Sequence, residues 1–150
     1  MREFHNILVA VDFSDSSDNA FQMALSMAEK FAAKLFILHV VNEPVDLRGF
    51  YVPHISFEKL EEEIEEGAKK IMQSFCRRNL EHFSNYECQI VPGIPYEQII
   101  SQAQTNNADL IVLGTHGRTG LDHVLFGSTA EKVVRKSPLP VLTVRLESEE

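Results

Sequence analysis

Short apolar runs alternate with helix-length amphipathic patterns along this chain of 150 residues. Residues 34–41 (KLFILHVV) are nearly all apolar, which is typical of a strand in a sheet with both faces covered. In residues 15–33, apolar side chains recur at the spacing of a helix that packs one face on a core. The pattern predicts strands over 6–12, 34–41, 86–91, 109–114 and 139–144. It predicts helices over 15–33, 56–83, 95–106 and 128–136.

This alternation favours a single α/β domain over residues 1–150, with a parallel sheet at its centre and helices on both faces. Right-handed crossovers leave few arrangements of five strands, and the order 3-2-1-4-5 suits the chain best. We therefore expect a doubly wound, Rossmann-like sheet, with residues 146–150 as a frayed tail. In this order the chain reverses direction between the first and fourth strands, and ligands bind at the carboxyl ends of strands at such a point.

A glycine-rich segment, residues 114–129, lies between the fourth predicted strand and the last predicted helix, and it holds four of the seven glycines. Glycine leaves the backbone N–H groups of such a segment accessible. A helix that starts at Ser128 adds unpaired donors and the positive end of a helix dipole. The segment therefore predicts an anion site, most plausibly for the phosphates of a nucleotide.

The overall composition excludes other kinds of partner. A net charge of −8 argues against nucleic acid, because affinity for nucleic acid comes mainly from Lys and Arg on phosphates. No apolar stretch approaches the roughly 18 to 20 residues that span a bilayer, and the N-terminus lacks the pattern of a signal peptide. We expect a cytoplasmic protein that binds neither nucleic acid nor membrane.

Each candidate residue also has a purely structural interpretation. Ser128 and Glu131 form the pattern Ser-x-x-Glu, a capping box that stabilises a helix start without any ligand. Asp12 could cap the helix that begins near Asp15, and the glycines could serve only a tight turn. Arg118 could pair with a phosphate or lie in solvent. These alternatives remain open at the level of the sequence.

The histidines and cysteines give no metal or redox motif. His116 and His123 have no Cys or third His at ligand spacing, so we do not expect zinc. His39, at the end of a predicted strand, is expected to be a hydrogen-bonded residue at the edge of the core. Cys76 and Cys88 are too far apart for a CxxC motif and are expected to be ordinary reduced thiols. The sequence therefore predicts no catalytic residue and no metal-ligating residue.

The glycine pattern resembles that of the universal stress protein family, in its ATP-binding branch. Gly114-x-x-Gly117, nine residues, then Gly127-Ser128 matches every fixed position of that branch. The resemblance extends over nearly the full length, through ILVAVDFS at 7–14, LHV at 38–40, VPG at 91–93 and SPLPVL at 137–142. It implies an adenine nucleotide alpha hydrolase-like fold and a site for ATP or another adenine nucleotide, with Mg²⁺ bridging the phosphates.

The resemblance also implies roles for individual residues. Backbone groups of Val40 pair with adenine, and Asp12 accepts from the ribose hydroxyls. Gly114, Thr115 and Gly117 line the ribose and first phosphate, and residues 127–129 bind the outer phosphates. The full candidate set is Asp12, Val40, Gly114, Thr115, His116, Gly117, Arg118, Gly127, Ser128 and Thr129.

The expected function is nucleotide binding by a stress-response regulator or switch, with slow or no hydrolysis. The glycine segment contains no lysine for the β- and γ-phosphates, and the nearby carboxylates are Asp12 and Asp122. The resemblance implies a homodimer, and the apolar edge strand over 139–144 is suited to pairing with its copy. The protein partner of such a regulator is unknown. The alternative is a family member that works without nucleotide, as a dimer that docks other proteins. An adenylating enzyme would need a second substrate domain, for which the chain has no room.

Overall fold

A computed structural model describes residues 3–42, 57–116 and 126–146, with the side chains of residues 57 and 58 left aside. The strands are β1 (Asn6–Ala10), β2 (Lys34–Asn42), β3 (Tyr86–Gly93), β4 (Leu110–Gly114) and β5 (Val141–Val144). The helices are α1 (Asp15–Phe31), α2 (Phe57–Asn79), α3 (Pro95–Thr105) and α4 (Ser128–Lys136). Strands and helices alternate along the chain as the sequence predicts.

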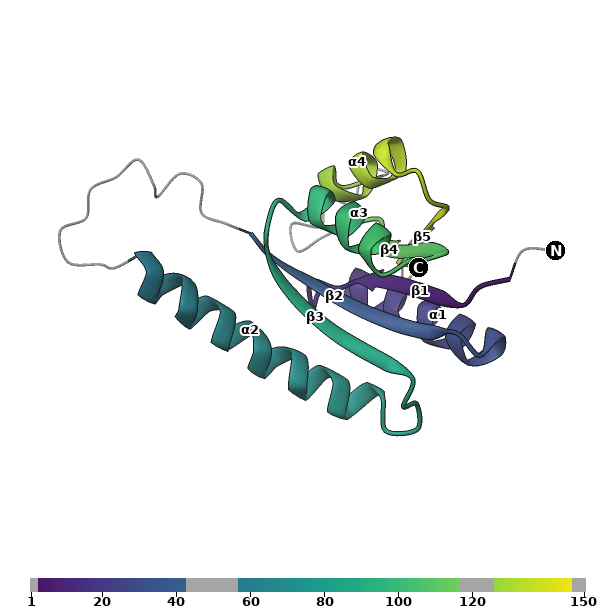
Figure 1. Ribbon diagram of the computed structural model, residues 1–150, viewed down its shortest axis with the longest axis horizontal. Coiled ribbons are helices and arrows are strands. Elements are labelled where there is room, and N and C mark those ends of the chain that lie inside the picture. Colours follow the sequence, from purple (N-terminus) through teal and green to yellow (C-terminus); the bar gives the residue numbers. More distant parts are fainter. Residues whose placement is uncertain (1–2, 43–56, 117–125, 147–150) are drawn as a thin grey trace.

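The strands form one parallel sheet in the order β3-β2-β1-β4-β5 (Figure 1). This is the predicted order, and the doubly wound fold is confirmed. Because β2 and β3 lie on one side of β1 and β4 and β5 on the other, the reversal of direction falls between β1 and β4. The carboxyl ends of these two strands therefore flank the expected ligand site.

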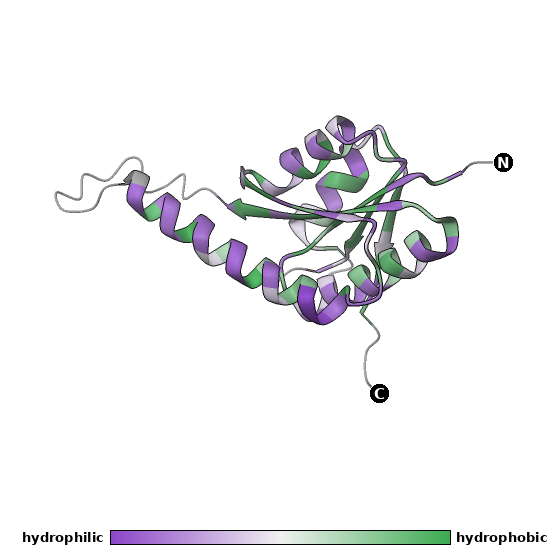
Figure 2. Cartoon of the chain, turned by 60° about the horizontal axis from the view of Figure 1, so that its bottom comes forward, coloured by the Kyte–Doolittle hydropathy of each residue, from purple (hydrophilic) through white to green (hydrophobic). Residues whose placement is uncertain are grey.

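Alternate residues of each strand face two separate hydrophobic clusters. Ile7 and Val9 of β1 face α1 and α2, whereas Leu8 faces α3 and α4, and all three are fully buried. The helices thus lie in pairs, α1 with α2 below the sheet and α3 with α4 above it (Figure 1). Figure 2 shows apolar strands at the centre and more polar residues on the outer faces of the helices. This explains the nearly continuous apolar pattern of the central strands.

Several element ends differ from the prediction, and local backbone structure explains the end of α1. α1 ends at Phe31 because Ala32 takes a left-handed conformation, with φ of 52°, and the N–H of Ala33 bonds to the carbonyl of Ala28. β1 ends at Ala10, although the N–H of Val11 still donates to Leu38 at 2.8 Å. α2 ends at Asn79 instead of 83, and β5 begins at Val141 instead of 139.

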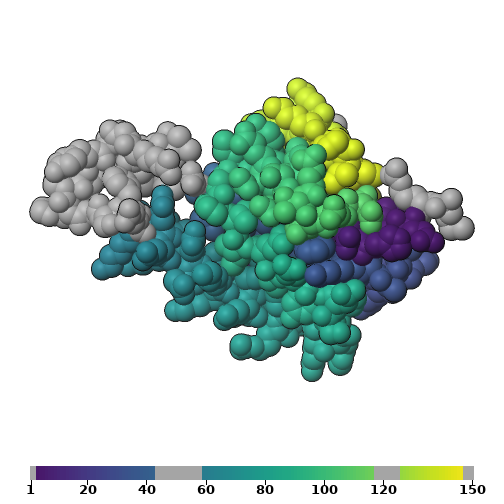
Figure 3. All heavy atoms as spheres, in the orientation of Figure 1, coloured from purple at the N-terminus to yellow at the C-terminus, as the bar shows by residue number. Residues whose placement is uncertain are grey.

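The helix α2 packs on the sheet only through its C-terminal half. The N-terminal half extends past the end of the sheet (Figures 1 and 3), and Ile64 there is 38% exposed. Within the described ranges, no helix has both the length and the apolar character needed to cross a bilayer.

Candidate nucleotide-binding site

A pocket of about 230 Å³ lies at the carboxyl ends of β1, β2 and β4, where the sheet reverses direction. The first turns of α3 and α4 complete its wall. Its described lining combines apolar side chains with hydroxyls, backbone and one carboxylate: Ala10, Val11, Asp12, Ser17, Leu38, Val40, Pro95, Ile99, Leu113, Gly114, Thr115, His116, Gly127, Ser128, Thr129 and Ala130. Such a mixture suits a ligand with one flat apolar part and one strongly polar part.

The wall formed by β2 presents an open stretch of strand edge at Val40. Lys34 donates across to His5, and Leu38 accepts from Val11, so the even-numbered residues of β2 direct their backbone groups toward β1. β1 ends at Ala10, opposite Leu38. The N–H and C=O of Val40 therefore point to the side on which β1 offers no further strand partner, and Val40 lines the pocket.

Asp12 follows β1 and organises the turn into α1. Its Oδ1 accepts from the N–H of Ser14 at 3.0 Å and from the Ser14 hydroxyl. Its own N–H donates to Ser17 Oγ at 3.1 Å. Ser14, and not Asp12, is the N-cap of α1, because its Oγ accepts from the N–H of Ser17. The capping alternative for Asp12 is therefore wrong in its direct form, since the carboxylate holds the cap residue instead.

His39, on β2, contacts the chain just before this turn. Its Nδ1 donates to the carbonyl of Val11 at 2.7 Å, because a carbonyl can only accept. Its ring packs against Phe13, with 4.7 Å between the ring centroids. Phe13 itself takes a left-handed conformation, with φ of 65°. The expectation of a hydrogen-bonded residue at the edge of the core is confirmed for His39.

The end of β4 approaches α1 so closely that position 114 has no room for a side chain. A Cβ on Gly114 would meet the Ser16 hydroxyl and would lie 2.9 Å from the Ser16 carbonyl oxygen. The next residue, Thr115, is buried, and its hydroxyl lies 3.0 Å from Nδ1 of His116. Gly114 thus brings the β4 end of the pocket against the first turn of α1.

The two ends of the glycine segment meet at one hydrogen bond. The N–H of Gly127 donates to the carbonyl of Thr115 at 2.6 Å, which places the start of α4 beside the end of β4. Gly127 is the N-cap of α4, and its carbonyl accepts the first helical bond, from Glu131. The N–H groups of Ser128, Thr129 and Ala130 precede that bond, so the helix itself supplies no acceptor for them.

This geometry rules out the capping box. Ser128 is the first residue of α4 and not its N-cap, and Gly127 has no side chain to cap with. Glu131 instead pairs with Arg135, at 2.7 Å, one turn further along the helix. The start of α4 therefore presents backbone amides and the Ser128 and Thr129 hydroxyls to the pocket.

The structure brings eight of the ten predicted residues to one pocket: Asp12, Val40, Gly114, Thr115, His116, Gly127, Ser128 and Thr129. Gly117 and Arg118 lie outside the described residues, as do Gly120, Asp122 and His123. The other eight lining residues were not in the predicted set: Ala10, Val11, Ser17, Leu38, Pro95, Ile99, Leu113 and Ala130. Pro95 and Ile99 come from α3, and no local pattern marks them, since they reach the site only through the packing of α3 on the sheet.

The described lining contains Asp12 and His116 but no lysine, arginine or cysteine. Within the described residues, no cluster of three or more His, Cys, Asp or Glu side chains is placed to hold a metal ion. Close to the pocket, Asp18 on α1 has a raised pKa, first because of burial and then because of repulsion from Asp15. The described groups are therefore suited to hydrogen bonding a ligand.

The sequence matches the universal stress protein family over residues 3–145. Universal stress protein YxiE of Bacillus subtilis is 34% identical over 147 residues, covering 95% of this chain and 99% of the relative. The structure of MJ0577, a universal stress protein of Methanocaldococcus jannaschii, has a TM-score of 0.85 and 29% identity, covering 99% of this chain and 100% of that one. A universal stress protein solved in complex with cAMP has a TM-score of 0.62 and 25% identity, covering 96% and 98%. The chain belongs to the universal stress protein family.

Proposed function

We propose that the pocket binds an adenine nucleotide, with ATP as the first candidate, and that the protein is a nucleotide-dependent regulator of a stress response. One observation carries the proposal. The start of α4, with three backbone amides that the helix leaves without acceptors, lines the same pocket as the open strand edge at Val40. A helix N-terminus favours phosphate, and a strand edge favours a planar base.

The base lies between apolar side chains and pairs with Val40. Adenine presents an amino donor and a ring acceptor on one edge, which match the C=O and N–H of a single strand residue. Guanine presents a carbonyl acceptor in place of that amino donor, so it pairs poorly with the same two groups. Leu38, Pro95 and Ile99 supply apolar surface for the ring. The relative solved with cAMP supports the adenine class.

The sugar and phosphates extend from β1 toward α4. Asp12 accepts from the ribose hydroxyls, and residues 114–116 pass beside the first phosphate. The amides of Ser128, Thr129 and Ala130 bind the outer phosphates, assisted by the Ser128 and Thr129 hydroxyls. A Mg²⁺ ion bound with the nucleotide would keep several of its waters, because Mg²⁺ dehydrates reluctantly.

Hydrolysis is expected to be absent or slow, so that bound nucleotide acts as a signal. The described lining supplies no lysine to the β- and γ-phosphates, and fast phosphoryl transfer normally requires such a cation. ATP then stabilises one conformation or assembly of the protein. A turnover above about 1 s⁻¹, the low end for kinases, would contradict this part of the proposal.

The melting temperature measures binding directly. Saturating Mg-ATP, at about 100 times Kd, stabilises the folded state by about 2.7 kcal/mol, which raises Tm by roughly 5 to 10 °C for a domain of this size. Mg-GTP is expected to give a clearly smaller shift. No shift with any adenine nucleotide would favour the alternative, a dimer that acts as a protein-interaction module without nucleotide.

Two substitutions at one position test which group binds the phosphates. Ser128→Pro removes the backbone N–H together with the hydroxyl, and proline is well tolerated at the first position of a helix. We expect a weaker Mg-ATP affinity, by roughly tenfold, with an unchanged Tm without nucleotide, because a hydrogen bond to a charged group contributes about 1.5 to 3 kcal/mol. Ser128→Ala is the matched control, because it removes only the hydroxyl and should cost less. Equal affinity in Ser128→Pro and the native chain would contradict a phosphate site at α4.

The proposal includes a homodimer formed through β5. β5 is an edge strand of the sheet, which supports pairing with a second copy across a two-fold axis. We further propose a cytoplasmic location and a protein partner that responds to the nucleotide state.

A further inference from the structure

The two cysteines of the chain, Cys76 and Cys88, lie in contact although they belong to different elements. Cys76 is on the C-terminal half of α2, and Cys88 is on the edge strand β3. Their sulfurs are 2.7 Å apart, and both are free cysteines. The sequence separation of 12 residues gave no sign of this contact, because the turn between α2 and β3 is what brings the two residues together.

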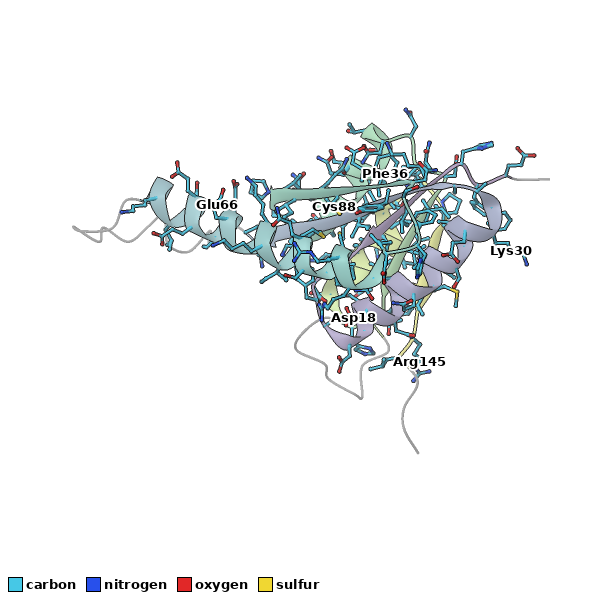
Figure 4. All side chains as sticks on the ribbon, turned by 90° about the horizontal axis from the view of Figure 1, so that it is seen from below. Asp18, Lys30, Phe36, Glu66, Cys88 and Arg145 are labelled. Atoms are coloured by element: carbon cyan, nitrogen blue, oxygen red, sulfur yellow. The ribbon has the colours of Figure 1, made fainter. Side chains whose placement is uncertain are left out.

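The arrangement needs little movement to become a covalent bond. The separation of the sulfurs exceeds a disulfide bond by only about 0.7 Å. Cys88 lies opposite Ile37 in the sheet and on the face that α2 covers (Figure 4). α2 is held against this face by Ala68, Met72 and Phe75, which are all buried. The packing of the helix therefore keeps the two thiols facing each other.

One thiol of the pair is exposed to solvent, and the other has a lowered pKa. Cys88 is exposed to solvent, whereas Cys76 is 7% exposed, so a molecule as small as hydrogen peroxide reaches the pair from the side of Cys88. The hydrogen bond from the Cys88 thiol lowers the pKa of Cys76 and favours its thiolate, which is the reactive form. The same contact raises the pKa of Cys88.

We propose that Cys76 and Cys88 form a reversible intramolecular disulfide on oxidation by a hydroperoxide, so that the contact between α2 and β3 is a redox-modification site. The Cys76 thiolate attacks one oxygen of hydrogen peroxide, the O–O bond breaks, and a sulfenic acid and a hydroxide form. The hydroxide takes up the proton lost by the Cys76 thiol and becomes water.

Cys88 then completes the reaction. Its sulfur attacks the sulfenic sulfur of Cys76, the S–S bond forms, and the S–OH oxygen leaves as water with the Cys88 proton. The two sulfurs lose two electrons, which reduce one peroxide to two waters. A small thiol reverses the reaction by exchange.

The oxidised form is expected to be more stable than the reduced form. The disulfide closes a short loop between α2 and β3, which restricts the unfolded chain. For a loop of this length in a domain of this size, Tm should rise by roughly 5 to 10 °C. The stabilisation does not depend on nucleotide, so it can be measured whether or not the proposed nucleotide site is correct.

The test uses the full chain, reduced and then treated with equimolar hydrogen peroxide. We expect the count of free thiols to fall from two to none, the mass to fall by about 2 Da, and Tm to rise, all reversed by dithiothreitol. The protein should run as a single chain on a non-reducing denaturing gel. Retained thiols, a mass gained in oxygen increments, or a disulfide-linked dimer would each overturn the proposal.

Single variants separate the roles of the two residues. Cys88→Ser changes an exposed position, so the chain should still fold, and oxidation should leave a sulfenic acid on Cys76 that dimedone traps once the chain is unfolded. Cys76→Ala/Cys88→Ser is the control, and its Tm should not respond to peroxide. If the double variant does not fold, the Cys88→Ser variant still decides the question. A rise of its Tm with peroxide would contradict the disulfide.

Discussion

At the scale of single residues, packing against a neighbour decides what position 114 can hold. Gly114 ends β4 next to the first turn of α1, and a Cβ there would collide with backbone atoms of Ser16, which cannot rotate away. Gly67, in the middle of α2, has open space around it, because a Cβ added there would meet no atom within 4 Å. Position 114 therefore has no room for a side chain, whereas position 67 could hold one.

Replacing each glycine by alanine tests this contrast. Gly114→Ala should reduce the free energy of unfolding by about 1 to 3 kcal/mol, because the added methyl overpacks a rigid contact. Gly67→Ala should increase it by about 0.5 to 1 kcal/mol, because alanine favours the helix and restricts the unfolded chain. Urea denaturation of both variants measures the difference. A neutral or stabilising Gly114→Ala would show that α1 and β4 separate more easily than this packing implies.

Asp18 gives a prediction that depends on pH. Burial, and then repulsion from Asp15 and Asp12, raise its pKa above 3.8, opposed in part by Arg78 (Asp18 is labelled in Figure 4). The folded state therefore binds this proton more tightly than the unfolded state, and stability falls as pH rises from about 4 through the raised value. Asp18→Asn should raise Tm slightly near pH 7 and give no gain near pH 3. Thermal melts at both pH values provide the check, and an equal gain at pH 3 would disagree with it.

At the scale of elements, α2 contributes to the core with only one part of its length. Phe75 is 3% exposed and packs edge-on against Phe21, with 4.7 Å between ring centroids, and against Phe13 at 5.7 Å. Ile71, one turn earlier, is 48% exposed. The aromatic cluster joins α2 to the turn that carries Asp12, so the position of the helix and the edge of the pocket depend on one set of contacts.

Truncating Phe75 and Ile71 in turn compares how much the buried and exposed faces of α2 contribute to stability. Phe75→Ala should lower the free energy of unfolding by about 3 to 5 kcal/mol, because it leaves a cavity next to the rings of Phe13 and Phe21. Ile71→Ala, the matched control on the same helix, should change it by less than about 1 kcal/mol. Chemical denaturation measures both. Similar losses in the two variants would mean that α2 is covered on its outer face in solution.

At the scale of the whole molecule, β5 provides the free edge on which the proposed homodimer depends. The carbonyl of Pro140, just before β5, accepts from Ile111 at 3.0 Å, and the carbonyl of Val144 accepts from Thr115, just after β4, at 3.3 Å. The backbone groups of Val141 and Thr143 therefore point away from β4, because they alternate with those that bond to it. A second copy can pair with these outward groups.

Thr143→Pro tests the dimer without disturbing the β4–β5 contact. Proline removes the outward N–H of residue 143 and is tolerated on an edge strand. Light scattering at micromolar concentration should show a dimer for the native chain and a shift toward monomer for Thr143→Pro. Thr143→Val keeps the N–H and should remain dimeric. If both variants remain dimeric, the copies associate through another surface.

The sequence alone determined the order of elements, the order of the strands and the region of the site. Spacing of apolar residues within a few positions is enough to distinguish strands from helices, and handedness rules then limit the topology. Element ends were less predictable. Ala32 takes the left-handed conformation that glycine usually supplies, so no residue type marked the end of α1.

Tertiary structure decided the roles that depend on distant neighbours. Gly127, and not Ser128, caps α4, and its N–H reaches Thr115 across the ends of the glycine segment. Gly114 is required by Ser16 of α1, and Cys76 meets Cys88 only after α2 has folded back on the sheet. The physical reason is the distance along the chain over which each kind of interaction acts. Local periodicity acts over a turn or two, whereas a cap, a close approach or a pair of facing thiols exists only once separate elements have packed together.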